Sequence, residues 1–334
     1  MSQFSAPHIL GGVRRFFEAG AMMRTSLLFV LPAAVVIAAN PAALEARKAE
    51  VQALLEEHNY ASALELAKSI NRERMDDIAS YQLIAAAHLG LGNYAEAESA
   101  IQWMLDLRIG KAEPGGWMLV ARFREITGDL EGAADAVNLA ARDWKGDPNE
   151  LLAYAAHLQF LMGKLERAGQ LATGNMKATY TLARVLLAQG RKSEAARLLR
   201  GVGETSPESL FLLASATGEA KDFQAFEAAA RACSERSRNT NRELVLYLAG
   251  RGKRVKEALT IAQREAERSH DVFTQDALAV AMYANGLRIE ARDLMKRVIA
   301  VGVRDPDILA HAAMMKLPQR PPQVASASSK AITR

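Results

Sequence analysis

The sequence predicts an all-α protein, a solenoid of about eight helix-turn-helix repeats, and three observations support this. Half of the 334 residues are hydrophobic, whereas β-branched or aromatic runs of strand length are nearly absent. A glycine followed five positions later by an alanine recurs along the chain. The segment that begins at Tyr60 also returns 34 residues later at Tyr94, which indicates a repeat array. A solenoid buries its core between neighbouring repeats, so we expect one domain despite the length of the chain.

The glycine and the alanine of each pair have separate physical roles. Each glycine follows an Ala/Leu-rich run of helix length and precedes a second one, so it is expected to end the first helix in the left-handed conformation. The alanine is expected where the two helices touch, because a larger side chain would push their axes apart. The pairs are Gly92/Ala97, Gly128/Ala133, Gly163/Ala168, Gly190/Ala195 and Gly286/Ala291. We expect repeats of this kind to stabilise one another in series, each through its two neighbours.

The stretch Gly92-Asn93-Tyr94-Ala95-Glu96-Ala97 resembles the core of a tetratricopeptide repeat, and the resemblance covers about residues 44–315. It implies a right-handed α-solenoid. The intervals between successive glycines are 36, 35, 27 and 96 residues. The interval of 27 predicts a shortened second helix after Gly163. The interval of 96 holds two weaker copies without the glycine, at residues 222–226 and 254–258.

The solenoid is expected to occupy residues 44–316, between an extension at 1–43 and a disordered tail at 317–334. Pro148 and Pro207 mark repeat boundaries, since proline is tolerated in the first turn of a helix. A last helix is expected to begin at Asp305 and to cap the eighth repeat. The tail is rich in Pro, Ser, Ala and Lys and has too little apolar surface to order itself.

The N-terminal extension contains an apolar run at residues 26–39, which follows a short positive region and ends in small residues. This layout is typical of a secretory signal peptide, and translation could begin at Met1 or at Met23. The run is shorter than a spanning helix and contains Pro32. An uncleaved membrane anchor and a buried cap helix are the alternatives. We therefore expect an exported, periplasmic protein of the bacterial cell envelope, or a membrane-anchored one.

A search for catalytic chemistry in the sequence finds no candidate set, so we expect no enzyme, no cofactor and no metal site. Cys233 is the only cysteine, which excludes a disulfide within the chain or a Cys-based zinc site. The six histidines are scattered, and no two lie four residues apart on one helix. Glycine-rich phosphate-binding signatures are absent, and so is the Gly-x-Ser-x-Gly nucleophile motif.

The charge of the chain gives little support for nucleic-acid binding. The net charge is only +4 over the whole length. The densest basic cluster, residues 251–256, falls at an inter-helix turn where long charged side chains are usually solvated. An RNA-binding or anionic-lipid-binding solenoid with a basic face remains the alternative. Pentatricopeptide proteins, the RNA-binding relatives, keep a stricter period with base-reading polar residues in every repeat.

The remaining prediction is a protein-binding scaffold or adaptor, with a protein or peptide partner. The resemblance implies that the first helix of each repeat lines a concave groove. Its positions there mix aromatic residues with arginine, as peptide-binding hot spots do. We expect an extended or helical partner segment with acidic and apolar residues to lie along this groove. The positions carried over are Gln82, Met118, Arg122, Glu125, His157, Phe160, Tyr180, Arg184, Phe211, Tyr247 and Tyr283.

Overall fold

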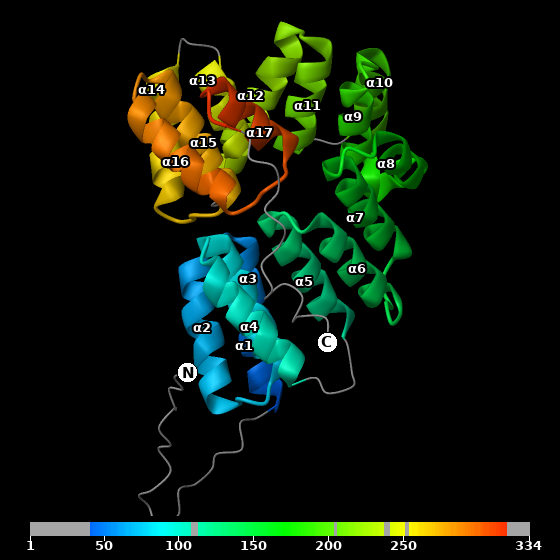
Figure 1. Cartoon of the computed structure of the whole chain (residues 1–334), viewed down its shortest axis with the longest axis vertical. Helices are drawn as coiled ribbons and strands as arrows, with labels where there is room; N and C mark the ends of the chain where they lie inside the picture. The colour runs from blue at the N-terminus through cyan, green and yellow to red at the C-terminus, as the bar shows by residue number, and fades with distance from the viewer. Residues whose placement is uncertain (1–40, 108–112, 204–205, 237–240, 251–253, 319–334) are drawn as a thin grey trace, which may run out of the picture. The chain divides into compact units, whose positions relative to one another are not determined.

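The computed structural model describes residues 41–107, 113–203, 206–236, 241–250 and 254–318, and within these ranges the fold is entirely helical. Helices pair along the chain as antiparallel hairpins, each a first and a second helix (Figure 1). The first helices are α1 (Pro41–Glu56), α3 (Ile78–Leu91), α5 (Pro114–Thr127), α7 (Pro148–Leu161), α9 (Thr179–Ala188), α11 (Pro207–Thr217), α13 (Arg242–Gly250) and α15 (Val272–Ala284). The second helices are α2 (Tyr60–Glu73), α4 (Tyr94–Asp106), α6 (Leu130–Ala141), α8 (Leu165–Ala172), α10 (Lys192–Val202), α12 (Ala220–Arg236), α14 (Val255–Ala266) and α16 (Arg288–Ala300). A short 3-10 helix, η1 (Met176–Ala178), precedes α9, and α17 (Pro306–Met314) follows the eighth pair.

The prediction of about eight helical repeats is confirmed, and so are the signals that end and begin the helices. All five signature glycines have a positive φ, between 72° and 85°. At the first of them the N–H of Gly92 donates to the carbonyl of Leu89, and the N–H of Asn93 donates to that of His88. These two bonds satisfy carbonyls that the end of α3 would otherwise leave unpaired. Pro148 and Pro207 begin α7 and α11 as expected.

The signature alanines lie where the helices of a repeat cross. The equivalent alanines in seven of the repeats have no exposed surface: Ala63, Ala97, Ala133, Ala168, Ala195, Ala258 and Ala291. In the sixth repeat the buried residue at this point is Phe226. Its ring is accommodated because it packs against aromatic side chains of the neighbouring first helices, Phe211 and Tyr247.

Replacing a packing alanine with leucine is expected to overpack its helix crossing. Ala97→Leu, Ala133→Leu and Ala195→Leu should each lower the free energy of unfolding by about 1–3 kcal/mol. Ala95→Leu is a matched control for the first of them, since Ala95 is exposed on the same helix. Chemical denaturation measures the difference. Three variants as stable as the parent protein would mean that these crossings have room for a larger side chain.

The core is continuous at both ends of the array but divided in the middle. One large cluster of buried apolar residues runs through α1–α7 and again through α12–α17. The buried residues of α8–α11 form three small clusters instead. Helix α8 has only eight residues, which confirms the shortened second helix predicted from the interval of 27. A short helix has less apolar surface to bury, so repeats four to six form the least consolidated part of the array.

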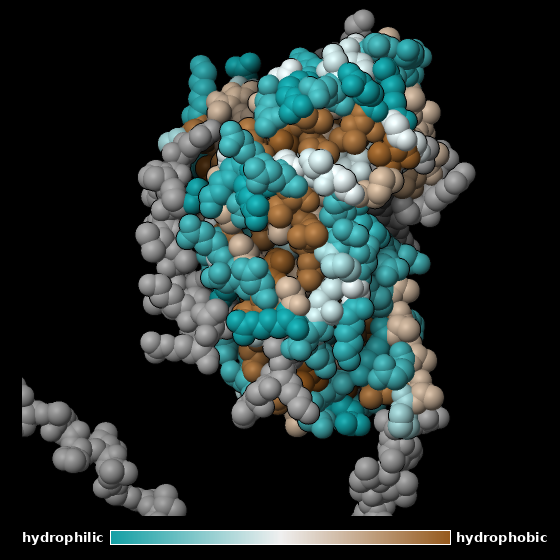
Figure 2. Space-filling model, turned by 90° about the vertical axis from the view of Figure 1, so that its right-hand side faces the viewer, coloured by the Kyte–Doolittle hydropathy of each residue, from teal (hydrophilic) through white to brown (hydrophobic). Residues whose placement is uncertain are grey.

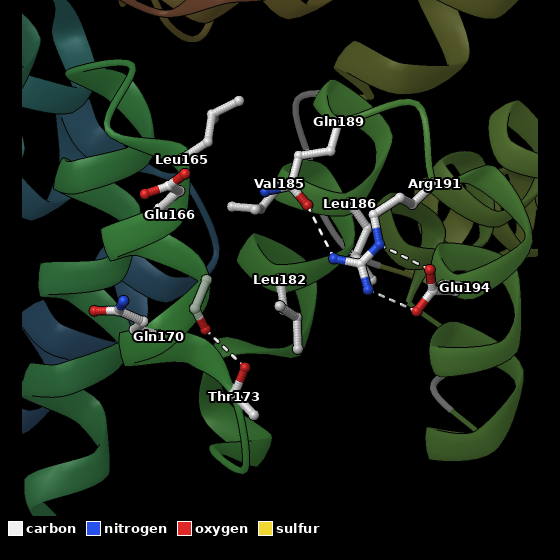
Figure 3. Close-up of a pocket in the computed structure, with 11 residues that line it drawn as sticks. Leu165, Glu166, Gln170, Thr173, Leu182, Val185, Leu186, Gln189, Arg191 and Glu194 are labelled. Carbon is white, nitrogen blue, oxygen red and sulfur yellow. Dashed lines mark hydrogen bonds and ion pairs between the residues drawn. The ribbon is translucent and has the colours of Figure 1, made fainter.

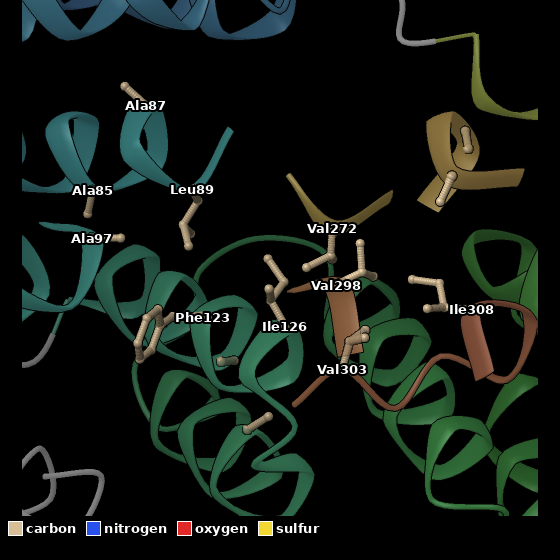
Figure 4. Close-up of a cluster of buried hydrophobic side chains, with 14 of the residues drawn as sticks. Ala85, Ala87, Leu89, Ala97, Phe123, Ile126, Val272, Val298, Val303 and Ile308 are labelled. Carbon is tan, nitrogen blue, oxygen red and sulfur yellow. The ribbon is translucent and has the colours of Figure 1, made fainter. Parts of the chain in front are cut away.

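The large cluster is continuous because the eighth repeat packs directly on the second and third. The hydroxyl of Ser269 donates to the carbonyl of Gly90, and the N–H of Val272 donates to the hydroxyl of Tyr94, at 2.9 Å. Ile126 lies beside Val272 of the eighth repeat, and Leu89 belongs to the same buried cluster as Val298 and Val303 (Figure 4). The expectation that repeats support one another only in series is therefore wrong here.

We call this contact the clasp, defined as residues 269–272 and 301–308 with the side chains and turns that they touch in α3–α6 and α9. At two signature glycines, the backbone of the second or third repeat comes very close to the backbone of residues 269–272 or 301–308. A Cβ on Gly92 would overlap the carbonyl of His270, and a Cβ on Gly128 would overlap the carbonyl of Gly302. Gly302 also has a positive φ, 104°, and its own missing Cβ faces the carbonyl of Thr127. The absence of these side chains lets the loops of the eighth repeat approach the turns of the second and third.

The apolar run at residues 26–39 and the tail beyond residue 318 lie outside the described residues, so the extension, the tail and their boundaries stay predictions. Among the helices that the structure describes, none combines the length and the apolar character needed to cross a bilayer.

Candidate partner-binding surfaces

The first helices α5, α7 and α9 share a surface that we call the inner face. A buried polar cluster lies on it between α5 and α7. The hydroxyl of Tyr154 donates to Glu125, and His157 Nε2 lies 3.0 Å from the other carboxylate oxygen of Glu125. Burial alone would raise the pKa of Glu125, but hydrogen bonding and charge interaction with His157 hold it below its ordinary value. Burial and the neighbouring carboxylate raise the pKa of Tyr154.

Arg184 on α9 connects this face to the segment that precedes α17. Its guanidinium lies 4.5 Å from the centre of the Phe160 ring and forms ion pairs with Asp305 at 3.3 Å and Asp307 at 3.1 Å. The arginine side chain is 10% exposed. Burial would raise the pKa of Asp305, yet the charges of Arg184 and Arg242 hold it below its ordinary value.

A second set of ion pairs joins α13, α15 and α17. Arg242 on α13 pairs with Asp276 on α15 at 3.1 Å, and its guanidinium lies 5.6 Å from the centre of the Phe273 ring. Asp276 has no exposed surface, and His311 Nδ1 on α17 lies 2.8 Å from its carboxylate. Buried charges of both signs are therefore compensated on this face by neighbours within the chain.

These clusters surround a cavity of about 120 Å³. Its polar lining comes from Glu125, His157, Arg184, Arg242 and Asp305, and Phe273 and Val303 are among its apolar lining residues. A space of this size holds a few water molecules. It is too small for an extended peptide, and Val303 and Asp305 of the segment after α16 form part of its wall.

The structure therefore brings together only part of the predicted groove. Glu125, His157 and Arg184 line one cavity, with Phe160 beneath the arginine. Tyr180 is mostly buried, and the charged groups near it include Arg184 and Arg242. Burial raises the pKa of Tyr180 to about 12. Arg122 is exposed, but it lies near enough to Glu125 for its charge to help lower the pKa of that carboxyl group. The other positions do not line the cavity. Phe211 and Tyr247 pack on Phe226, Gln82 and Met118 are half-buried, and the centre of the Tyr283 ring lies 5.8 Å from the guanidinium carbon of Arg288.

A larger hollow lies on the outer face, between second helices α8 and α10. Figure 2 shows apolar surface between hydrophilic ridges on the side of the molecule that carries these helices. The cleft has a volume of about 440 Å³. Leu182, Val185 and Leu186 of α9 are among its apolar lining residues, and Figure 3 shows them between the two second helices.

Polar side chains form the rim of this outer cleft. Arg191 donates two hydrogen bonds of 2.7 Å to Glu194 and one of 3.1 Å to Gln189 (Figure 3). Glu166, Gln170 and Thr173 are the polar residues of α8 and its C-terminal end that line the opposite side. The cleft therefore pairs an apolar base with donors and acceptors at its edge, a combination typical of binding sites.

The cleft has a local cause in the sequence. Helix α8 faces it with Gly169, whose missing Cβ would lie 3.7 Å from Val185 Cγ1. The backbone of α8 therefore lies close to α9, and no side chain at residue 169 fills the space above. The interval of 27 between Gly163 and Gly190 signalled the short helix, but the cleft itself was missed. A glycine in the middle of a short second helix was the signal that could have found it.

The basic cluster at residues 251–256 is only partly described, since residues 251–253 lie outside the described ranges. Arg254 pairs with Glu227 at 2.6 Å and with Glu257 at 2.8 Å. Arg231 pairs with the same two glutamates. The charge of Arg254 is thus balanced within the chain, whereas Lys256 is exposed.

Other candidate ligands do not converge in the described part of the chain. Within it, no group of three or more His, Cys, Asp or Glu residues could hold a metal ion. His88 is buried with its Nδ1 3.4 Å from the side-chain nitrogen of Asn93, and Cys233 is half-buried on α12.

Among known proteins, only solved structures are similar to this chain. No protein-family model matches the chain, and no curated protein matches it. Solved structures similar to it include tetratricopeptide repeat proteins. The fold itself, as its helix pairs show, is an all-α repeat solenoid. The C-terminal part of a tetratricopeptide repeat-containing protein from Cytophaga hutchinsonii is 14% identical, with a TM-score of 0.40, and the match covers 79% of this chain and 98% of that one. A tetratricopeptide repeat protein from Parabacteroides merdae is 12% identical, with a TM-score of 0.39 and coverage of 82% and 98%.

A third similar structure is the Cut9-Hcn1 hetero-tetramer of the APC/C. It is 12% identical, with a TM-score of 0.45, and the match covers 80% of this chain and 54% of that one. At these identities and TM-scores the likenesses carry no argument about this chain.

Proposed function

We propose that this protein is a non-catalytic protein-binding scaffold that holds a segment of a partner protein in the outer cleft between α8 and α10. The observation that carries the proposal is the cleft itself, with an apolar base on α9 and a polar rim on α8 and α10. Its volume of about 440 Å³ fits a few large side chains of a partner. A repeat array suits this role because it holds such a surface on regularly packed helices.

The chemistry of the cleft favours a segment with one apolar and one polar side. Apolar side chains of the partner would cover Leu182, Val185 and Leu186, which gains the free energy of removing both surfaces from water. The exposed pair Arg191–Glu194 presents both a cation and an anion at the rim, so it can meet either charge on the partner. The rim then sets orientation while the base supplies most of the affinity.

Filling the cleft from within tests this proposal. Gly169→Leu should occupy the space beside Val185 and abolish capture of the partner from an envelope extract. Gly169→Ala places its Cβ at an ordinary contact distance, 3.7 Å from Val185 Cγ1, so it should keep binding and add about 0.5–1 kcal/mol of helix stability. Gly201→Leu on α10 is the matched control, because nothing lies within 4 Å of its Cβ.

The captured protein should be the same for the parent, Gly169→Ala and Gly201→Leu, and should be missing for Gly169→Leu. Capture that survives in Gly169→Leu would rule out the cleft. Binding that instead falls steeply as salt rises would favour the alternative of RNA or anionic lipid on a basic face.

We further propose that the protein works in the bacterial cell envelope, exported to the periplasm by the apolar run at residues 26–39 or anchored to the membrane by it. Support comes from the positive region before this run and the small residues that end it. N-terminal sequencing of the native protein from fractionated cells tests the proposal. A mature start near Ala39 or Asn40 outside the cytoplasm is the expected result, and an intact Met23 start in the membrane fraction means an anchor. A cytosolic protein that keeps Met1 would contradict both forms.

A further inference from the structure

The segment after α16 that lines the inner cavity has the chemistry expected of a groove ligand. Residues 303–308, Val-Arg-Asp-Pro-Asp-Ile, place two acidic residues between two buried apolar ones. Arg184 pairs with both acidic residues, and Val303 lines the inner cavity beside Ile126. Arg184 of a first helix thus binds two aspartates that are flanked by apolar residues, as expected for a partner segment. Here, however, the segment belongs to the same chain.

Two separate sets of contacts hold this segment, one within the eighth repeat and one to the inner face. Helix α17 packs on α15 and α16, within the eighth repeat. Across the clasp, Arg184 contributes its two ion pairs, while Val303 and the Gly128–Gly302 approach supply packing. Asp305 also caps α17, since one carboxylate oxygen accepts from the N–H groups of Asp307 and Ile308. Its other oxygen is the one that meets Arg184.

We propose that residues 303–308 act as an internal ligand that keeps the inner face closed, and that a partner segment of the same kind, two acidic residues flanked by apolar ones at the start of a helix, binds there when the clasp opens. This proposal rests on the protein-binding role but uses a different surface from the outer cleft. The internal ligand has the advantage of a high effective concentration, so an external segment binds only in proportion to the open fraction.

A peptide supplied in trans tests the proposal. The probe is a fluorescent peptide of residues 301–317, and the full chain is the receptor, with binding followed by fluorescence anisotropy. The double substitution Asp305→Asn and Asp307→Asn in the receptor removes both charges from Arg184, while the amide oxygen of the new side chain at residue 305 can still accept the capping bonds of α17. The peptide should bind this receptor at least about tenfold more tightly than it binds the parent chain, because the open fraction is larger.

Three controls make the result specific for the inner face. A peptide with the same two Asn substitutions should not bind, because it offers Arg184 no carboxylate. Adding Arg184→Ala to the double-substituted receptor should abolish binding of the unmodified peptide. Gly169→Leu in the double-substituted receptor should leave peptide binding unchanged, so failure of this proposal and failure of the outer cleft can be told apart.

The outcomes decide the proposal whether or not the double variant folds. Absence of peptide binding to a receptor that circular dichroism shows to be folded would overturn it, and so would equal binding to the parent and the variant. If the double variant unfolds, Asp307→Asn alone takes its place, since Asp307 is 59% exposed and contributes only one of the two ion pairs. Tighter binding to that receptor supports the internal ligand, and unchanged binding overturns it.

Discussion

Gly128→Ala is expected to lower the free energy of unfolding by about 3 kcal/mol or more, whereas the same change at Gly286 should lower it by about 1 kcal/mol. Both glycines end a first helix with nearly the same φ, 85° and 83°. The backbone strain of a left-handed alanine is therefore common to both. Only at residue 128 would the new Cβ overlap another backbone, at the carbonyl of Gly302, whereas nothing lies within 4 Å of the Cβ at residue 286.

Chemical denaturation of the two variants measures this difference, and hydrogen exchange shows where it arises. In Gly128→Ala the amides of residues 269–274 and 301–308, apart from Pro306, should lose protection, because the eighth repeat is displaced from the third. Gly286→Ala should leave that protection intact. Equal losses of stability in the two variants would mean that the backbones at Gly128 and Gly302 do not meet.

The local features of the fold were predictable because short stretches of sequence encode them. A glycine after an Ala/Leu-rich run specifies the left-handed end of a helix, and all five signature glycines adopt it. An alanine five residues later specifies a close helix crossing, and Ala97, Ala133 and Ala195 are completely buried. The short spacing between Gly163 and Gly190 likewise predicted that α8 would be shortened.

The clasp could not be predicted in this way, because it joins residues far apart in the chain. Whether the eighth repeat reaches the third depends on the rotation between successive repeats, summed over an array with uneven intervals. Gly92 and Gly128 look the same in the sequence as Gly163 and Gly286, yet only the first two meet another loop. No local pattern distinguishes them.

The candidate sites show the same limit. The first-helix positions expected to line a groove include Glu125, His157 and Arg184, and these three residues line one cavity. Their role in partner binding stays a prediction. The sequence assigned Asp305 only to the start of a last helix, and it does cap α17. Its second role, as a partner of Arg184, depends on the clasp and so was not visible in the sequence.

Arg184→Ala is the second change expected to have a large effect, a loss of about 3 kcal/mol of unfolding free energy. The arginine is 10% exposed, and its removal leaves Asp305, which is 7% exposed, without its nearest cation. The cost comes mainly from that unpaired buried charge and not from the net strength of the ion pair. Arg191→Ala is the matched control, because Arg191 is 50% exposed and pairs with an exposed glutamate, so its loss should stay below about 1 kcal/mol.

A double substitution separates the two origins of the Arg184 effect. If the unpaired charge dominates, adding Asp305→Asn to Arg184→Ala should recover more than half of the lost stability, because asparagine is neutral and can still cap α17. If packing on Phe160 dominates, the double variant should be no more stable than Arg184→Ala, since the guanidinium over that ring is missing from both. Denaturation of the four proteins as a double-mutant cycle decides between them, and a single Arg184→Ala variant as stable as the parent would show that the clasp holds without this arginine.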